Sequence, residues 1–276
     1  MSDASQRARI HLHRGNLSEA RHWYAEAVKE ARNGEKDQAL TAALGNLGNV
    51  YAQLGEYTEA EACYHEVLTL QRREHHPSTV GETLVNLGNL KAESGNFETA
   101  RAYYLEAIDV LHPIEHHRAL GILYNNLALM ELATGQPGTA VVHFQRALEC
   151  HRTVGDELGL ANTFSQFGKA LLAQGDLQQA ERCLNNASEH FIKLGQEPSE
   201  AAVLRLLADI YETRGDHVSA WRCMERAVHV DRRYHLPEIE NDQERLALFH
   251  ARGKEARTSS APPASPATFK NQRPVE

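Results

Sequence analysis

The sequence predicts an all-α solenoid in which about six helical hairpins follow one another and a further helix closes the C-terminal end. Three observations lead to this prediction. One motif recurs every 40 residues, apolar residues on both sides of it follow a helical period, and glycine or proline interrupts the chain between units. Since each hairpin of such an array buries its apolar face against its neighbours, the chain needs no strand to form a core.

The recurring motif is a glycine followed five positions later by an alanine. Its glycines are Gly15, Gly55, Gly95, Gly135, Gly175 and Gly215, and its alanines are Ala20, Ala60, Ala100, Ala140, Ala180 and Ala220. Glycine commonly ends a helix, because it readily adopts the left-handed backbone conformation that follows the last turn. A small alanine lets two helices approach closely. The motif therefore predicts a tight turn inside each hairpin.

The unit around Gly55 illustrates one hairpin. A stripe at spacings of three and four predicts its first helix, and a second stripe after the glycine predicts its second helix. The first stripe is Leu44, Leu47, Gly48, Tyr51 and Leu54, and the second is Ala60, Tyr64, Val67 and Leu68. We expect Tyr51 and Tyr64 to fill the space beside the small residues. Pro137 suits the first turn of a second helix, where a missing N–H costs nothing.

The domain boundaries follow from this register. We expect repeats at about 1–34, 35–74, 75–114, 115–154, 155–194 and 195–234, within one solenoid domain over 1–251. The first unit has Arg7 and His11 where other units carry leucine and tyrosine, which suits a polar end of the array, and an incomplete first repeat is the alternative.

The segment after the last repeat divides into two parts. A helix over 237–251 is expected to cap the array through Leu246, Leu248 and Phe249. Residues 252–276 hold too few bulky apolar groups to bury, so we expect them to be a disordered tail.

The pattern Leu44-x2-Leu47-Gly48-x2-Tyr51 with Ala60-x3-Tyr64 resembles that of the tetratricopeptide (TPR) repeat. The resemblance covers nearly the whole chain and implies a right-handed superhelix whose first helices line a concave surface. The unit has 40 residues where 34 are usual, and it is similar to the repeats of kinesin light chains, spindle-orientation adaptors and bacterial TPR regulators. In such arrays function lies on the concave face, so the resemblance implies a protein or peptide partner.

Amide side chains recur on the helices that the resemblance places inside. They are Asn46, Asn49, Asn86, Asn89, Asn125, Asn126 and Gln166. An amide both donates and accepts hydrogen bonds, so a row of amides can hold the backbone of an extended peptide, as asparagines do in similar long-repeat adaptors. The alternative is that the amides bond to adjacent turns and tie the repeats together.

Charged positions complete the expected groove. Lys169 and Arg205 follow on the later repeats, whereas Glu82 and Glu93 make the early part neutral to acidic. The resemblance implies that a clamp for a C-terminal carboxylate needs a base just before the asparagines, at Gly45 and Val85. Neither residue is basic, so we expect an internal, extended peptide segment across repeats two to five.

Composition limits the class of partner. The formal net charge is -8 and the sequence pI is about 6.1, so we expect no nucleic acid, because phosphate binding needs a basic surface. No apolar run approaches the roughly 20 residues of a membrane span, and the N-terminal segment is polar. We therefore expect no membrane insertion and a cytoplasmic location.

The sequence favours neither a metal nor a cofactor nor a catalytic centre. The histidines near the loops lack the i, i+4 helical pairing with an acidic partner that marks a zinc site, apart from His112 and His116 around a proline; the others are His75, His76, His117 and His151. No nucleotide loop or nucleophile elbow is present. Cys63, Cys183 and Cys223 recur at one position of the second helix, which indicates packing, and with Cys150 we expect four free thiols.

The sequence therefore favours a protein–protein interaction adaptor or scaffold. Two alternatives remain at this point: a regulatory TPR module that senses a peptide or small ligand, and, much less favoured, an enzyme. The identity of the partner and the oligomeric state do not follow from the sequence.

Overall fold

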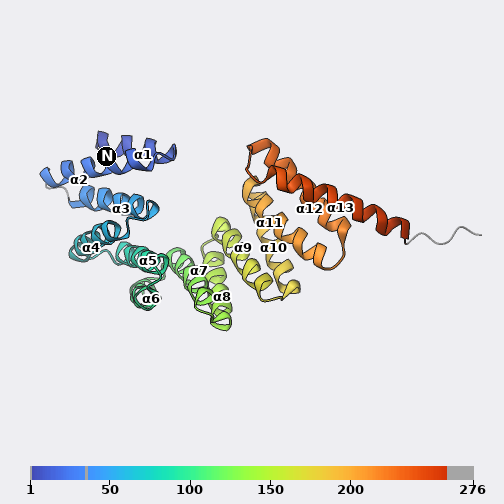
Figure 1. Ribbon diagram of the computed structural model, residues 1–276. Coiled ribbons are helices and arrows are strands. Elements are labelled where there is room, and N and C mark those ends of the chain that lie inside the picture. Colours follow the sequence, from blue (N-terminus) through green and yellow to red (C-terminus); the bar gives the residue numbers. More distant parts are fainter. Residues whose placement is uncertain (1, 35–36, 260–276) are drawn as a thin grey trace, which may run out of the picture. The chain divides into compact units, whose positions relative to one another are not determined.

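The computed structural model describes residues 2–34 and 37–259, with side chains of the last helix as far as Arg252. Within these ranges the chain forms thirteen α-helices and no strand (Figure 1). They are α1 (Asp3–His13), α2 (Leu17–Asn33), α3 (Asp37–Gln53), α4 (Tyr57–Glu74), α5 (Pro77–Glu93), α6 (Phe97–Leu111), α7 (His117–Ala133), α8 (Pro137–Thr153), α9 (Glu157–Ala173), α10 (Leu177–Lys193), α11 (Glu197–Thr213), α12 (His217–Tyr234) and α13 (Ile239–Ser259). The predicted succession of helical hairpins is confirmed.

The recurring motif forms the turn inside each hairpin, as predicted. Its six glycines have φ between 74° and 82°, in the left-handed region that favours glycine. In the second hairpin, the Gly55 N–H donates to the Ala52 carbonyl, and the Glu56 N–H donates to the Tyr51 carbonyl at 2.9 Å. These bonds satisfy carbonyls that the end of α3 leaves open. The six alanines of the motif are fully buried, so the two helices of each hairpin meet closely there.

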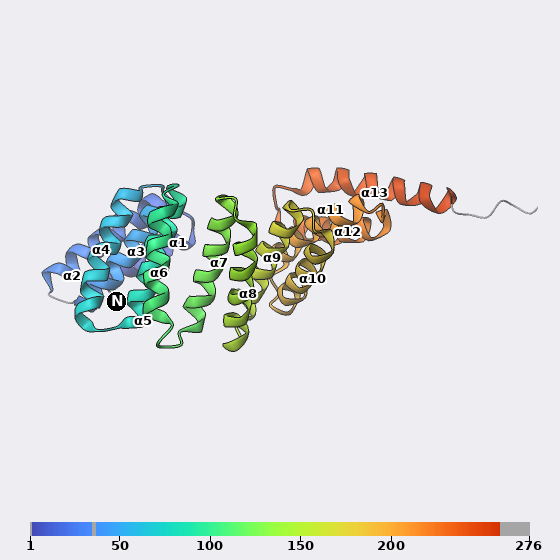
Figure 2. The ribbon, with the colours of Figure 1, turned by 90° about the horizontal axis from the view of Figure 1, so that it is seen from below.

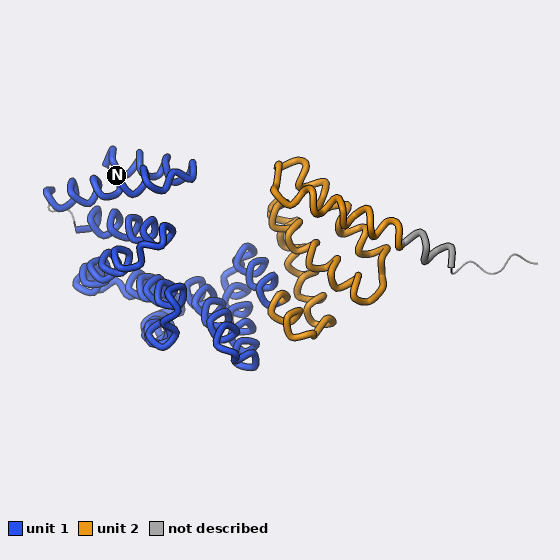
Figure 3. Tube along the Cα trace, in the orientation of Figure 1, with its two compact units in different colours: residues 1–167 blue, residues 168–276 orange. Residues whose placement is uncertain are grey.

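The chain divides into two compact units, residues 1–167 and 168–276, and the division falls within α9 (Figure 3). In the first unit, each helix from α1 to α7 packs against the next, and α5 also contacts α7. Fully buried side chains such as Leu84, Tyr104 and Leu127 form its core. The first helices α3, α5 and α7 therefore follow one another within one unit.

In the second unit, α13 packs against α12 and closes the array (Figure 2). Phe249 and Leu246 make the expected contacts, and Phe249 is fully buried beside Met224. The expectation for Leu248 is wrong, because that side chain is 44% exposed. Helix α13 runs to Ser259, past the expected end at 251, and residues 260–276 of the expected tail lie outside the described residues.

His151 of α8 is a buried polar contact of the first unit. It lies between two glycines, Gly121 of α7 and Gly159 of α9. A Cβ on Gly121 would lie 2.8 Å from the imidazole ring, and a Cβ on Gly159 would lie 2.1 Å from it. Its Nδ1 is 3.1 Å from Asp156, whose other oxygen accepts from the Gly159 N–H at the start of α9. Burial lowers the pKa of His151, and Asp156 opposes this only in part.

This lowered pKa predicts a loss of stability in mild acid. The unfolded chain binds a proton more readily than the folded chain does, so the contribution of His151 is complete above its ordinary pKa of 6.5. This stabilising contribution begins to decrease when the pH falls below 6.5, and it is lost once the pH has passed the lower pKa that His151 has in the folded state. We expect His151→Gln to show a weaker fall in unfolding free energy between pH 7 and pH 5 than the wild type, measured by denaturant titration. Equal pH dependence would contradict this role.

Candidate functional site

The site begins with a hydrogen bond that recurs in two hairpins. The Tyr64 hydroxyl donates to Oδ1 of Asn49 at 2.7 Å, and 40 residues later the Tyr104 hydroxyl donates to Oδ1 of Asn89 at the same distance. Burial, above all, raises the pKa of Tyr64 to about 12 and raises that of Tyr104 as well. Both hydroxyls therefore keep their protons and act as donors.

The residue before each asparagine explains why the tyrosine reaches it. A Cβ on Gly48 would lie 2.8 Å from the Tyr64 ring, and one on Gly88 would lie 2.5 Å from the Tyr104 ring. Both distances are too short for real atoms, so only glycine leaves room for the ring against the first helix. The later hairpins carry Phe144, Leu184 and Met224 in place of the tyrosine, and they have no asparagine after the small residue.

A second set of bonds joins neighbouring repeats. Asn126 of α7 donates from Nδ2 to Oδ1 of Asn89 of α5 at 2.8 Å. Below the same surface, the buried Thr83 hydroxyl donates to Oε1 of Gln71 at 2.8 Å, which links α5 to α4. Some amides thus tie repeats together, as the alternative interpretation proposed for the row. These bonds between repeats leave some N–H donors of the amides unused, because each amide nitrogen carries two N–H groups.

Three adjacent hollows follow the row of amides along α3, α5 and α7. The first has a volume of about 330 Å³ and lies between Thr41 and Asn86. The second, of about 230 Å³, shares Asn49, Tyr64 and Asn86 with the first. The third, again of about 330 Å³, shares Asn89 and Glu93 with the second and extends to Asn126. We call these three hollows the amide groove.

The charge of the amide groove has one sign. Its lining includes the carboxylates of Glu74, Glu82 and Glu93, and no lysine or arginine is present among the described residues that line it. Two of the carboxylates have only a distant histidine beside them: His76 at 3.9 Å from Glu74 and His116 at 3.8 Å from Glu82. A guest with positive charge would meet no repulsion here.

The predicted amides divide into two groups. Asn49, Asn86, Asn89 and Asn126 line the amide groove. Asn46 is exposed on α3, and Gln166 is half-buried on α9, but neither lines any of the three hollows. Asn125 does not line them either, and its Oδ1 is buried without a hydrogen-bond partner among the described residues.

The two predicted basic residues belong to the second unit. Lys169 is exposed on α9. Arg205 of α11 forms ion pairs with Asp231 of α12 and Asp242 of α13, both fully buried. Its guanidinium is therefore engaged in holding the terminal helices together, and neither residue lines the amide groove.

The described residues offer little for chemistry. No group of three or more His, Cys, Asp or Glu side chains in this part of the chain has an arrangement that holds a metal ion. The four cysteines are free thiols, and burial raises the pKa of Cys63, Cys183 and Cys223 to about 11, so these thiols are protonated near neutral pH. None of the helices described is both long and apolar enough to cross a membrane.

Sequence profiles match almost all of the helical array. The profile of the MalT-like TPR region matches residues 5–155, and a tetratricopeptide repeat profile matches residues 159–233. The chain belongs to the tetratricopeptide repeat family. The predicted TPR fold is thereby confirmed, and the chain belongs to a family of protein-interaction and regulatory modules. No curated protein matches the chain in sequence.

Solved TPR structures share the fold at low sequence identity. BtubC (BKLC) from P. vanneervenii is 18% identical, with a TM-score of 0.70 over 94% of this chain and 99% of that one. A Rap protein complexed with Competence and Sporulation Factor is 12% identical, with a TM-score of 0.65 over 91% and 75% of the two chains. A STAND protein with a tetratricopeptide repeat sensor from Pyrococcus horikoshii is 18% identical, with a TM-score of 0.64 over 89% of this chain and 38% of its own.

Sequence reasoning identified the asparagines but missed the tyrosine hydroxyls that hold two of them. The sequence does contain a signal for this bond. In the second and third repeats, a Gly-Asn pair is followed by a tyrosine that lies 16 residues after the glycine, and no later repeat has this pattern. The pairing follows from the hairpin geometry, since the two positions lie opposite each other across the turn.

Proposed function

We propose that the protein is a non-catalytic adaptor that holds an extended, basic peptide segment of a partner protein in the amide groove of its first unit. The observation that carries this proposal is the continuity of the three hollows, because adjacent ones share Asn49 and Asn86 or Asn89 and Glu93. An extended segment spans up to about 3.3–3.6 Å per residue, so it can follow neighbouring repeats with few residues.

The amides suit a peptide backbone because of the bonds already made. Oδ1 of Asn89 is occupied by Tyr104 and Asn126, which leaves Nδ2 of Asn89 to donate. Asn86 makes no side-chain hydrogen bond within the described chain, so both its donor and its acceptor are available. Donors and acceptors at intervals along a groove match the alternating carbonyl and N–H groups of an extended chain.

The carboxylates indicate the side chains that the guest carries. Glu74 and Glu82 line the first hollow, and Glu93 lines the second and third. Lysine or arginine side chains from the guest would supply the opposite charge, which raises the association rate and selects against acidic partners. The fold agrees with a binding role, since a Rap protein of similar fold was solved in complex with a factor.

Replacing Asn86 tests the proposal without removing a structural bond. A peptide is first selected from a random dodecapeptide display library on the full chain, and its dissociation constant is measured by fluorescence anisotropy. We expect the selected peptides to be rich in lysine and arginine, and we expect Asn86→Ala to weaken binding at least about tenfold, the loss of one to two hydrogen bonds. Glu93→Gln should weaken binding most at low salt.

Asn186→Ala is the matched control. Asn186 is an exposed amide on α10, and its side chain bonds only to the Arg182 carbonyl of the same helix. Circular dichroism should show unchanged helicity for both asparagine variants. Peptides that bind Asn86→Ala as tightly as the wild type, or a selection that favours acidic peptides, would contradict the proposal.

A further inference from the structure

Ion pairs join consecutive second helices at a fixed register in the first unit. Arg32 of α2 reaches Glu66 of α4 through two bonds of 2.6 and 2.8 Å. Forty residues later, Arg72 of α4 pairs in the same way with Glu106 of α6. An arginine in the last turn of one helix thus binds a carboxylate on the next, at two successive junctions.

The third junction breaks this pattern. The positions that follow by another 40 residues are His112, at the end of α6, and Arg146, on α8. The carboxylate has been replaced by a guanidinium, so two donor side chains stand where a donor and an acceptor stood before. Arg146 has no carboxylate partner among the described residues, and its Cζ lies 5.6 Å from the centre of the Tyr124 ring.

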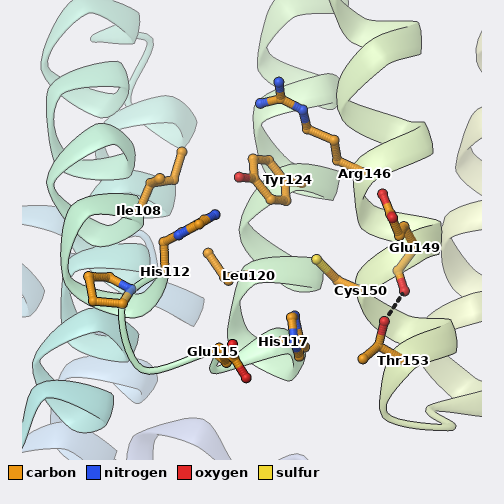
Figure 4. Close-up of a pocket in the computed structure, with 11 residues that line it drawn as sticks. Ile108, His112, Glu115, His117, Leu120, Tyr124, Arg146, Glu149, Cys150 and Thr153 are labelled. Carbon is orange, nitrogen blue, oxygen red and sulfur yellow. Dashed lines mark hydrogen bonds between the residues drawn. The ribbon is translucent and has the colours of Figure 1, made fainter.

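A hollow of about 820 Å³ lies at this junction, more than twice the size of any hollow of the amide groove. Helix α6 ends at Leu111, because Pro113 lacks the N–H that would continue the helix beyond His112, whose own N–H still donates to the Ile108 carbonyl. In the repeat register, α6 therefore stops two residues earlier than α8 and three residues earlier than α4. Figure 4 shows His112, Tyr124 and Arg146 around one end of the hollow, with Ile108 and Leu120 beside them.

We propose that this hollow binds a small ligand with an oxyanion, a phosphate or carboxylate group, attached to an aromatic or apolar body. The anionic group of the ligand would take the place of the glutamate carboxylate that is present at the two earlier junctions. It would contact the guanidinium of Arg146 and the imidazole of His112. Guanidinium groups bind such oxyanions through paired N–H donors. The body of the ligand would lie on Tyr124, Ile108 and Leu120, which give the hollow its apolar wall.

Two carboxylates also line the hollow and limit the ligand. Glu115 lies at the end away from Arg146 in Figure 4, and Glu149 follows Arg146 by three residues on α8. Neither forms an ion pair with Arg146 within the described chain. The ligand must therefore carry its negative charge at one end only, since a second anion would face Glu115.

Phenyl phosphate is a suitable probe, because it joins one oxyanion to one ring. It is titrated into the full chain by calorimetry, with inorganic phosphate and phenol as the two half-ligands. We expect binding of phenyl phosphate at one site, at least tenfold tighter than that of either half-ligand. Arg146→Gln should weaken it at least tenfold, with unchanged helicity.

A double variant provides the matched test of the mechanism. H112R/R146E restores the arginine–glutamate pair of the earlier junctions, so it should fold, should melt no lower than the wild type, and should lose phenyl phosphate binding. The proposal is overturned if phenyl phosphate does not bind the wild type, if the double variant binds it equally well, or if inorganic phosphate or phenol binds as tightly. Benzoate in place of phenyl phosphate tells a carboxylate site from a phosphate site.

Discussion

Replacing Arg205 with alanine is expected to release the C-terminal helices and to cost about 3–5 kcal/mol, the usual loss when one partner of a buried ion pair is removed. Asp231 and Asp242 are fully buried, and Arg205 is the cation that pairs with both. Burial raises the pKa of Asp231, and the pairing with Arg205 opposes that shift. Without Arg205, α11, α12 and α13 would meet around two unpaired carboxylates.

Hydrogen exchange with mass spectrometry measures this effect best, because repeat arrays need not unfold in one step. We expect faster exchange over residues 197–252 in Arg205→Ala and unchanged exchange in α3 to α7. Arg214→Ala is the control, since the Arg214–Glu181 pair is partly exposed and should contribute less than about 1 kcal/mol. An Arg205→Ala protein with exchange equal to that of Arg214→Ala would contradict the structural role of Arg205.

Gly88→Ala is expected to destabilise the first unit by about 1–3 kcal/mol, as overpacking of a well-packed core does. The new Cβ would come within 2.5 Å of the Tyr104 ring, which is only 1% exposed and has no room to move. This outcome reverses the ordinary preference of a helix for alanine. The ring would also carry its hydroxyl away from Asn89, which disturbs the amide groove.

Gly45→Ala is the matched control, with the opposite expected sign. Gly45 lies in the helical interior of α3, and a Cβ there meets nothing within 4 Å. Alanine at this position should stabilise the helix by up to about 1 kcal/mol. Denaturant titrations of both variants test the pair. A Gly88→Ala protein as stable as Gly45→Ala would show that the tyrosine ring does not require the glycine.

Much of the fold could be predicted from the sequence, because its determinants are local and recur. The constant interval of the Gly-x-x-x-x-Ala motif gave the hairpins and their turns. Helix ends followed from residues such as Gly55 and Pro137, whose backbone preferences need no tertiary context. Leu248 was placed wrongly because the last helix has no following repeat, so its buried face could not be read from the repeat register.

The site was harder to predict, because side-chain partners depend on contacts between helices. The row of asparagines was visible, but the bond from Tyr104 to Asn89 required the distance across the hairpin. Arg205 occupies a position equivalent to Gly45 and Val85, and only the contact with α13 revealed that aspartates surround it. Conversely, the change from Glu106 to Arg146 at one register was visible in the sequence, and the hollow beside it was not.

The most direct test of the amide groove is a backbone N-methyl scan of a peptide selected on the full chain. N-methylation removes one N–H donor at a time and leaves the side chains in place. If amide side chains hold the backbone, methylation at alternate positions should weaken binding at least about tenfold, while replacement of most single side chains by alanine has smaller effects. Binding that tolerates every N-methyl group, but is lost with one side chain, would contradict the proposed role of Asn86 and Asn126, whose amide oxygens are the free acceptors of the row.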